Sequence, residues 1–264
     1  YKGINGFIIG GFMELNSYID YTNLKKDALI EDIEKLCEEA MKYHFASVCV
    51  YPYFVKAVSE YLKGSNVEIC TVVGFPNGMN TTNVKVYEAI DAIENGATEI
   101  DMVINISALK NKEYDYIKNE IEEIRDAIGG KTLKVIIETC LLTDEEIVKM
   151  TEICNDTFVN FIKTSTGFDK EGAKVEDIEL INKHKGAVLE IKASGGIRDI
   201  ETAEAMIKAG ATRIGTSSGV KLMNIEEKEE KECNCNHEKH NCKCNHEHKH
   251  EHHECKCKNK GKEE

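Results

Sequence analysis

The chain has 264 residues, 11 cysteines and a formal net charge of −13. These totals conceal a change in composition, because residues 226–264 hold 6 of the 11 cysteines and 7 of the 9 histidines but no Val, Ile, Leu, Met, Phe, Tyr or Ala. The 11 Glu and 9 Lys of that tail contribute −2, which leaves −11 for residues 1–225; such acidity disfavours nucleic acid and anionic membranes as partners, and no apolar run is long enough for a membrane span.

Residues 1–225 alternate apolar, strand-like runs with amphipathic stretches of helical period. In chain order, the expected strands cover residues 17–22, 46–51, 67–73, 99–105, 133–139, 158–164, 188–194 and 212–216. Apolar helical stripes cover residues 30–41, 54–62, 86–93, 114–128, 147–153 and 200–207, and a short helix is expected through Val220 and Leu222. The sequence Thr143-Asp-Glu-Glu146 is a capping box that opens one of these helices.

Eight strands alternating with seven or eight helices in about 225 residues predict the α/β class and a (β/α)8 TIM barrel. A doubly wound open sheet shares this alternation, but eight even units without a composition break favour a closed barrel. The strands are mostly apolar along their whole length, as expected when both faces are buried. We therefore expect a barrel domain at residues 1–225 and a disordered Cys/His-rich C-terminal tail at residues 226–264.

In a barrel of this kind, function lies at the carboxyl ends of the strands. Lys163 and Lys192 each follow an apolar strand, so both side chains are expected at that end. Lost hydration and a second ammonium group nearby both lower the pKa of a lysine, which yields a neutral amine that can attack a carbonyl. The alternative is that one or both lysines only form ion pairs with Asp20, Asp101 or Glu138.

Two glycine-rich loops follow the seventh and eighth strands, where barrel enzymes often bind phosphate. The first contains Gly195-Gly196, and the second runs from Gly215 through Ser217 and Ser218 to the expected short helix. Glycines let backbone N–H groups approach an anion closely. The alternative is that these glycines only make tight turns. Together with the two lysines, the loops predict a Schiff-base aldolase that acts on a small phosphorylated carbonyl compound.

Six segments between Ser17 and Leu222 resemble deoxyribose-phosphate aldolase, a class I aldolase family with a (β/α)8 fold. They are TVVGFP at 71–76, EIDMVIN at 99–105, KVIIET at 134–139, FIKTSTGF at 161–168, IKASGGIR at 191–198 and RIGTSSG at 213–219. The resemblance implies reversible cleavage of 2-deoxy-D-ribose 5-phosphate to acetaldehyde and D-glyceraldehyde 3-phosphate in deoxyribonucleotide and carbohydrate catabolism, without a required cofactor.

The resemblance also implies roles for individual residues. Lys163 would form the Schiff base, Lys192 would be the second lysine that tunes it and helps proton transfer, and Asp101 would move protons. Asp20 and Thr22 would support the site from the first strand. The residues expected to hold the phosphate are Gly167, Gly195, Gly196, Arg198, Gly215, Ser217 and Ser218.

The chain departs from the family pattern at three places. Tyr21 stands where the family often has His, and we expect its side chain to point away from the site. Phe168 stands where some members have a basic residue, which weakens charge neutralisation of the phosphate. The tail has no Tyr, although some members end in a Tyr linked to proton transfer.

Cysteine usage separates the two parts of the chain. The five cysteines of residues 1–225 are scattered in apolar contexts, which is typical of reduced, buried thiols; Cys49, at a strand end, is expected to be one of them. We therefore expect a cytoplasmic protein, with a targeting segment upstream left open because the chain lacks an initial Met. The expected partner is a small phosphorylated sugar or aldehyde, and a homodimer or higher homo-oligomer is allowed.

The tail contains three Cys-x-Cys pairs interleaved with histidines. They are Cys233 and Cys235, Cys242 and Cys244, and Cys255 and Cys257. Thiolate and imidazole ligands suit Zn²⁺ or Cu⁺, so the tail is either a metal-binding segment or a low-complexity extension without a selected role. A second hypothesis for the whole protein is therefore metal buffering or sensing, with the barrel as a carrier.

Overall fold

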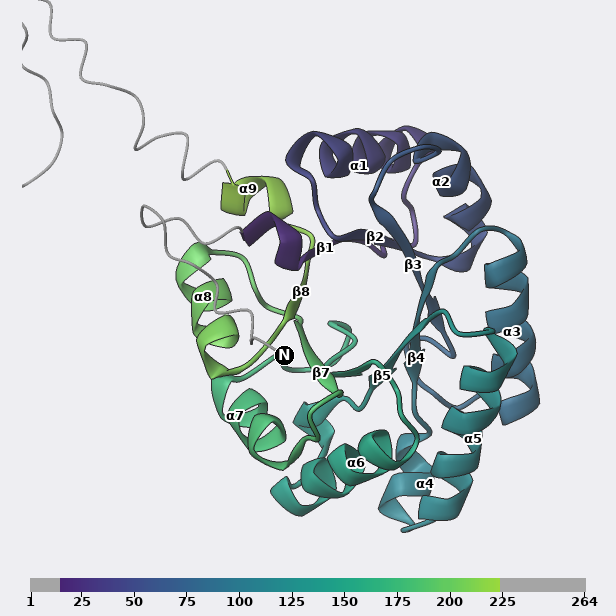
Figure 1. Cartoon of the computed structure of the whole chain (residues 1–264), viewed down its shortest axis with the longest axis vertical. Helices are drawn as coiled ribbons and strands as arrows, with labels where there is room; N and C mark the ends of the chain where they lie inside the picture. Colours follow the sequence, from purple (N-terminus) through teal and green to yellow (C-terminus); the bar gives the residue numbers. More distant parts are fainter. Residues whose placement is uncertain (1–14, 224–264) are drawn as a thin grey trace, which may run out of the picture.

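The computed structural model describes residues 15–223, which form a closed barrel of eight parallel strands surrounded by helices (Figure 1). The strands follow one another around the barrel in sequence order. They are β1 Ile19–Asn23, β2 Ser47–Val50, β3 Glu68–Val73, β4 Glu99–Val103, β5 Thr132–Ile136, β6 Phe161–Lys163, β7 Glu190–Ser194 and β8 Arg213–Thr216. The barrel closes where β1 pairs with β8, with Asp20 opposite Gly215, and the predicted (β/α)8 fold is confirmed.

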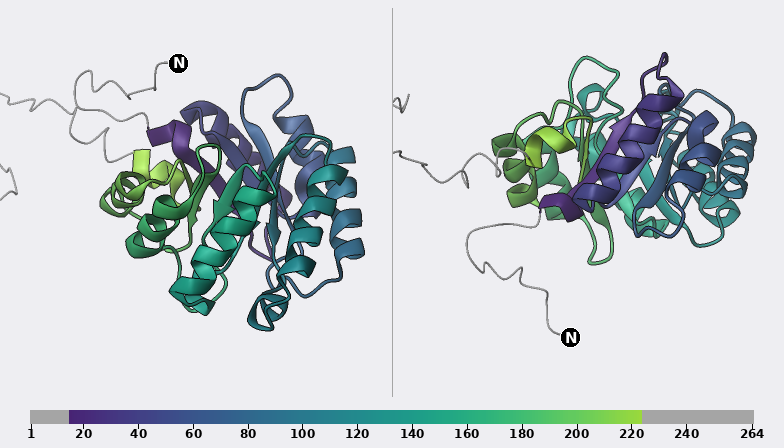
Figure 2. Two further views of the ribbon diagram at one scale, coloured as in Figure 1. Left: turned by 60° about the horizontal axis from the view of Figure 1, so that its bottom comes forward. Right: turned by 90° about the horizontal axis from the view of Figure 1, so that it is seen from above.

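The helices lie outside the strands and follow the same course around the barrel (Figures 1 and 2). The α-helices are α1 Ile30–Tyr43, α2 Val55–Tyr61, α3 Thr82–Glu94, α4 Ile106–Lys110, α5 Tyr114–Ala127, α6 Asp144–Asp156, α7 Val175–His184, α8 Ile200–Ala209 and α9 Gly219–Met223. Short 3-10 helices cover Leu15–Tyr18 (η1), Pro52–Phe54 (η2) and Thr139–Leu141 (η3).

Local sequence explains how several of these helices begin and end. Thr143 precedes α6, and its Oγ1 accepts a hydrogen bond from the Glu146 N–H at 3.3 Å while the Glu146 carboxylate accepts from the Thr143 N–H at 2.9 Å. This is the predicted capping box. Asp199 caps α8 by accepting from the Thr202 N–H at 2.8 Å. Gly210 ends α8 with a φ of 124°, a conformation that favours glycine.

The strands are buried on both faces, because one face lines the barrel and the other meets the helices. On α5, the residues Ile117, Ile121 and Ile124 recur every three or four positions and are fully buried. They belong to the same apolar cluster as Ile100 and Met102 of β4. Burial of each such side chain stabilises the fold by about 1.5–3 kcal/mol, so the helical layer fixes the strands that carry the polar residues inside the barrel.

The sequence-based boundaries were wrong at the sixth repeat. We expected a strand over residues 158–164, but β6 begins only at Phe161. Phe158 instead follows α6 with a φ of 53°, and its side chain is 74% exposed. The helix α7 was also not predicted, since its apolar residues, among them Ile178 and Ile181, are interrupted by charged ones.

Some of the predictions concern membrane spans or residues outside 15–223. No helix within residues 15–223 is both long and apolar enough to cross a membrane. The outer limits of the expected barrel domain at 1–225, the tail at 226–264 and all six tail cysteines lie outside the described residues.

Candidate active site

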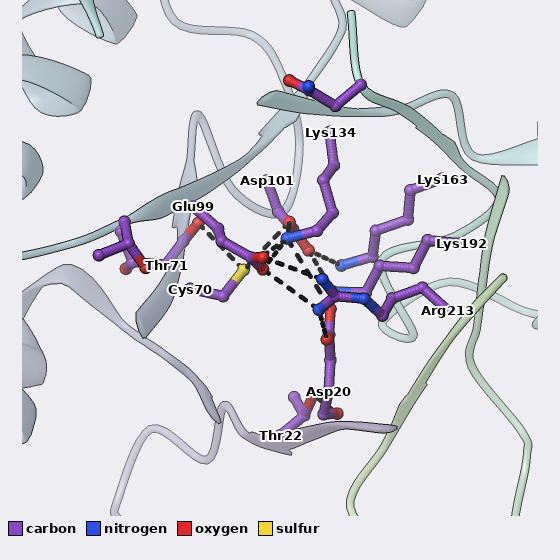
Figure 3. Close-up of polar contacts among 12 residues, drawn as sticks. Asp20, Thr22, Cys70, Thr71, Glu99, Asp101, Lys134, Lys163, Lys192 and Arg213 are labelled. Carbon is purple, nitrogen blue, oxygen red and sulfur yellow. Dashed lines mark hydrogen bonds and ion pairs between the residues drawn. The ribbon is translucent and has the colours of Figure 1, made fainter. Parts of the chain in front are cut away.

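The polar residues predicted at the strand ends converge inside the barrel (Figure 3). Asp101 of β4 lies at the centre. Its Oδ2 is 2.7 Å from the Nζ of Lys163 on β6 and 2.7 Å from the Nζ of Lys192 on β7. Parallel register explains the meeting of the two lysines, because Lys163 pairs directly with Lys192 across β6 and β7. One carboxylate oxygen therefore joins both lysines that the sequence singled out.

The charge of Asp101 is strongly stabilised although the side chain is fully buried. Burial by itself raises the pKa of a carboxyl group. Here, however, the ammonium groups of Lys134, Lys163 and Lys192 outweigh burial and hold the pKa of Asp101 well below its usual range. Asp101 is thus an ionised hydrogen-bond acceptor shared by three lysines.

Lys192 is held by two carboxylates. Besides Asp101, its Nζ lies 2.5 Å from Oδ2 of Asp20 on β1. Burial favours the neutral amine, but the charges of Asp101 and Asp20 raise the pKa of Lys192 above its ordinary value. The expectation that two neighbouring lysines would both have lowered pKa values is therefore wrong for Lys192, since its carboxylate partners prevail over burial and over Lys134.

A deeper layer of charges was missed by the sequence analysis. The Nζ of Lys134 on β5 lies 2.5 Å from Glu99 and 3.0 Å from Asp101. Arg213 of β8 contacts Asp20 at 2.5 Å and Glu99 at 3.0 Å. The signal in the sequence for Lys134 is a lysine inside the apolar run predicted as the fifth strand, and in the structure it lies directly opposite Asp101 across β4 and β5.

These ion pairs give the barrel interior an extended network. Every carboxylate in it has at least two cationic partners, and the cations come from four different strands (Figure 3). The network therefore fixes the relative positions of strands that are far apart in the sequence. Lys163 lies on the side of the network that faces the carboxyl ends of the strands.

A cavity of about 520 Å³ opens above this network, at the carboxyl ends of the strands. Lys163 lines it, whereas Asp20, Asp101 and Lys192 lie below the lining. The other predicted residues that line it are Thr22, Gly167, Gly195, Gly196, Arg198, Gly215 and Ser217. Ser218 is the predicted residue that lies beside the lining rather than in it. Lys163 is thus the network amine that a substrate in the cavity can reach.

The glycine-rich side of the cavity requires glycine for steric reasons. Gly195 and Gly196 have φ values of 87° and 79°, and Gly167 has a φ of 82°. A Cβ on Gly195 would lie 2.9 Å from the Cα of Gly172. The helix α9 has only five residues, so the expected contribution of a helix N-terminus is small compared with that of the loop itself.

Cations also line this side of the cavity. Arg198 is exposed and lines it, as expected. Lys25 and Lys35, which were not singled out from the sequence, also line the cavity. Phe168 lines the cavity as well and makes an edge-to-face contact with Phe75 at 5.2 Å, so position 168 supplies an apolar wall.

Two thiols adjoin the network. Cys49 and Cys70 pair directly across β2 and β3, and both are fully buried, which confirms the expectation for Cys49. The Cys70 Sγ lies 3.1 Å from Oδ1 of Asp101 and 3.4 Å from the Nζ of Lys134. These two thiols and Asp101 offer ligand atoms within 4.8 Å of one another, but the carboxylate is already paired with lysines.

Glu138 does not join the lysine network. An ion pair between Glu138 and one of the lysines was among the possibilities left open from the sequence. Within residues 15–223, no ion pair involves its carboxylate, which instead accepts hydrogen bonds from Thr166. The segment that carries Lys163 is therefore held by Glu138 through Thr166.

Comparison with known proteins gives a consistent result. The family described as DeoC/LacD family aldolase matches residues 16–224. A deoxyribose-phosphate aldolase of Clostridium tetani is 54% identical over 80% of this chain and 98% of its own length, and one of Finegoldia magna is 55% identical over 80% and 99%. The tetrameric deoxyribose phosphate aldolase of Aeropyrum pernix superposes with a TM-score of 0.75 at 31% identity, over 81% of this chain and 91% of that one.

Proposed function

The chain belongs to the DeoC/LacD family of aldolases, and on this basis we propose how its barrel carries out the reaction of a deoxyribose-phosphate aldolase. The enzyme is a class I aldolase that reversibly cleaves 2-deoxy-D-ribose 5-phosphate to acetaldehyde and D-glyceraldehyde 3-phosphate. The observation that carries the residue assignment is the position of Lys163, which both lines the cavity and contacts the buried Asp101 at 2.7 Å.

Lys163 is the nucleophile. In its neutral form, its Nζ attacks the C1 aldehyde of the open-chain sugar and forms a carbinolamine. Asp101 accepts a proton from the attacking nitrogen and returns it to the C1 oxygen, and a second proton, supplied by the Lys192 ammonium group through Asp101, lets this oxygen leave as water. The product is a protonated imine between Lys163 and the substrate. The short contacts from Asp101 to both lysines allow Lys192 to supply or take up this proton in turn.

The iminium group then drives carbon–carbon cleavage. Asp101, ionised again, takes the proton of the C3 hydroxyl, and the C2–C3 electron pair moves toward the iminium nitrogen, which yields an enamine and releases D-glyceraldehyde 3-phosphate. Asp101 returns this proton to the enamine carbon, and water hydrolyses the resulting protonated imine to acetaldehyde and free Lys163. The proton taken up during imine formation returns to Lys192 through Asp101. Lys192, directly opposite Lys163 across β6 and β7, keeps a positive charge beside the reacting groups, which stabilises negative charge that develops on oxygen.

The phosphate binds on the glycine-rich side of the cavity. Gly167, Gly195 and Gly196 bring backbone close to the anion, and Arg198 supplies a positive charge at the same wall. Gly215 of β8 and Ser217 of the turn after it extend this wall, with Ser218 beside them, and Thr22 borders the cavity from β1. Since residues 1–225 carry about −11, these local groups supply the attraction that the whole protein does not.

Replacing the two lysines separately tests the assignment. We expect Lys163→Met to lower kcat for 2-deoxyribose 5-phosphate cleavage by at least about 10³-fold, because no amine is left to form the imine. Lys192→Met removes proton transfer but keeps the nucleophile, so its loss should be smaller, on the order of 10²–10⁴-fold. The exposed Lys170 provides the control, and Lys170→Met should behave as wild type. Full activity of Lys163→Met would exclude the Schiff-base route through this residue.

The tail, the location and the assembly are further parts of this proposal. We infer a cytoplasmic homo-oligomer. In support, the five cysteines of the described residues are free thiols, and Tyr53, Met79 and Tyr87 expose 60–87% of their surface.

For residues 226–264 we propose Zn²⁺ or Cu⁺ binding that is independent of catalysis. Light scattering tests the assembly, and unchanged turnover after truncation at Ile225 or addition of a chelator tests that independence.

A further inference from the structure

The backbone at Glu138 has a conformation that Glu rarely adopts. Its φ and ψ are 54° and 67°, which lie in the left-handed region. Within the described residues, three other non-glycine residues have positive φ, namely His44, Lys112 and Phe158, and all three are exposed. Glu138 differs because its exposed fraction is only 4%. A strained backbone at a buried residue persists only when the surroundings favour it.

The carboxylate of Glu138 explains what the unusual conformation achieves. It accepts hydrogen bonds from the Thr166 N–H at 3.2 and 3.3 Å and from the Thr166 hydroxyl. The Thr166 Oγ1 in turn accepts from the Phe168 N–H at 3.1 Å. A carboxylate suits this place because it is acceptor-only, whereas a glutamine amide would direct a donor at one of the two Thr166 donors.

These bonds determine which backbone donor of the loop remains available. The Thr166 N–H donates to Glu138, and the Phe168 N–H donates to the Thr166 hydroxyl oxygen. The N–H of Gly167, between them, has no acceptor in the described part of the chain, and Gly167 lines the cavity. A Cβ on Gly167 would lie 3.8 Å from the Cα of Gly195, and Gly196 and Arg198 line the same cavity.

We propose that Glu138 is a positioning residue that acts through Thr166 to hold residues 164–168 so that the Gly167 N–H faces the substrate phosphate. This inference rests on the proposed function, because it assumes that the phosphate binds at this wall. Glu138 touches no reacting atom in this account. Its effect is on binding of the phosphorylated end of the substrate, and thus on the preference for a phosphorylated over an unphosphorylated sugar.

The substitution Glu138→Gly tests the role of the carboxylate independently of the backbone conformation. Glycine adopts a positive φ without strain, so Glu138→Gly keeps the left-handed turn and removes only the acceptor. We expect its KM for 2-deoxyribose 5-phosphate to rise by about tenfold or more, with a smaller change in kcat. The kinetics with unphosphorylated 2-deoxyribose should stay near those of wild type. Glu138→Gln, which retains one acceptor oxygen, should lie between the two.

His44→Gly is the matched control, because it places glycine at another left-handed position, exposed at the end of α1. Its kinetics with both sugars should equal those of wild type. Thermal denaturation checks that each variant is folded. For each variant, kcat/KM with the phosphorylated sugar is divided by kcat/KM with the unphosphorylated sugar measured on that same variant. A loop that is merely disordered would lower activity with both sugars, whereas a positioning role lowers it mainly with the phosphorylated one.

The same kinetics distinguish a wrong phosphate site from a wrong role of Glu138. If wild type shows no preference for the phosphorylated sugar, the phosphate site of the proposed function is wrong. If wild type has that preference and Glu138→Gly retains it in full, or loses activity equally with both sugars, the role of Glu138 is refuted.

Discussion

Replacing Asp101 by Asn removes the carboxylate that contacts both Lys163 and Lys192 while preserving the size of the side chain. In the barrel interior of the described structure, four cations face three carboxylates. They are Lys134, Lys163, Lys192 and Arg213 against Asp20, Glu99 and Asp101. The substitution leaves only two carboxylates, so the excess positive charge increases by one unit in a place that is almost fully buried.

The size of the effect follows from burial. Removing one partner of a buried ion pair costs about 3–5 kcal/mol, and the loss here falls toward the lower value if one of the lysines releases its proton. Catalysis suffers separately, because no carboxylate remains to pass the proton between the lysines and the C1 oxygen. We expect kcat to fall by about 10²–10⁴-fold. Urea denaturation measures the first effect, and an assay of acetaldehyde release measures the second.

Glu99→Gln is the matched control. Glu99 is buried and contacts Lys134 and Arg213 at 2.5 and 3.0 Å, but it does not contact Lys163 or Lys192. It should therefore lose a comparable amount of stability with a much smaller change in kcat. Equal losses of kcat in the two variants would refute the assignment of proton transfer to Asp101, and a change in stability below about 1 kcal/mol in Asp101→Asn would refute the charge argument.

Three other predictions follow from the same structure. The pKa values of Asp20 and Asp101 are lowered in the folded state, so their contribution to stability is present above the unfolded value of about 3.9 and is lost as the pH falls further. The pKa values of Lys134 and Lys192 are raised in the folded state, so the contribution of these lysines to stability is lost only as the pH rises beyond about 10.4. The urea midpoint should therefore not fall through this network between about pH 4 and 10. If the midpoint falls below about pH 4 by the same amount in Asp101→Asn as in wild type, Asp101 does not contribute to the loss of stability in acid. Arg198→Ala should raise KM for the phosphorylated sugar by about tenfold with little change in kcat, since it removes one partner of the phosphate; an unchanged KM places the phosphate elsewhere. Ile121→Ala should lower the free energy of unfolding by about 2–5 kcal/mol with normal KM, because the side chain is fully buried between α5 and the barrel.

The fold could be predicted because its signals are local. Apolar runs and amphipathic stripes each cover about ten residues, and the capping box at Thr143 lies within four. The sixth repeat failed for a physical reason, since Phe158 and Val159 look strand-like although the chain there is still leaving α6 in a left-handed turn. Tertiary context decides such positions, and local propensity does not.

The candidate site was predicted in outline but not in its electrostatics. Strand ends and the resemblance led to Lys163, Lys192 and Asp101, and in the structure each lysine Nζ lies 2.7 Å from Oδ2 of Asp101. Lys134 and Arg213 were missed because candidates were sought at the carboxyl ends of the strands, whereas Lys134 lies in the middle of β5 and Arg213 is the first residue of β8. The direction of the pKa shift of Lys192 depends on Asp20, which is 172 residues away in sequence but 2.5 Å away in space.

Borohydride reduction in the presence of substrate tests the central claim most directly. Reduction converts the imine between Lys163 and the sugar or acetaldehyde into a stable amine, which peptide mapping by mass spectrometry can locate. We predict one modified peptide, with the adduct on Lys163, formed only when substrate is present and absent from the Lys163→Met variant. An adduct on Lys192 or Lys134 in the wild-type protein, or none on any lysine during turnover, would contradict the account.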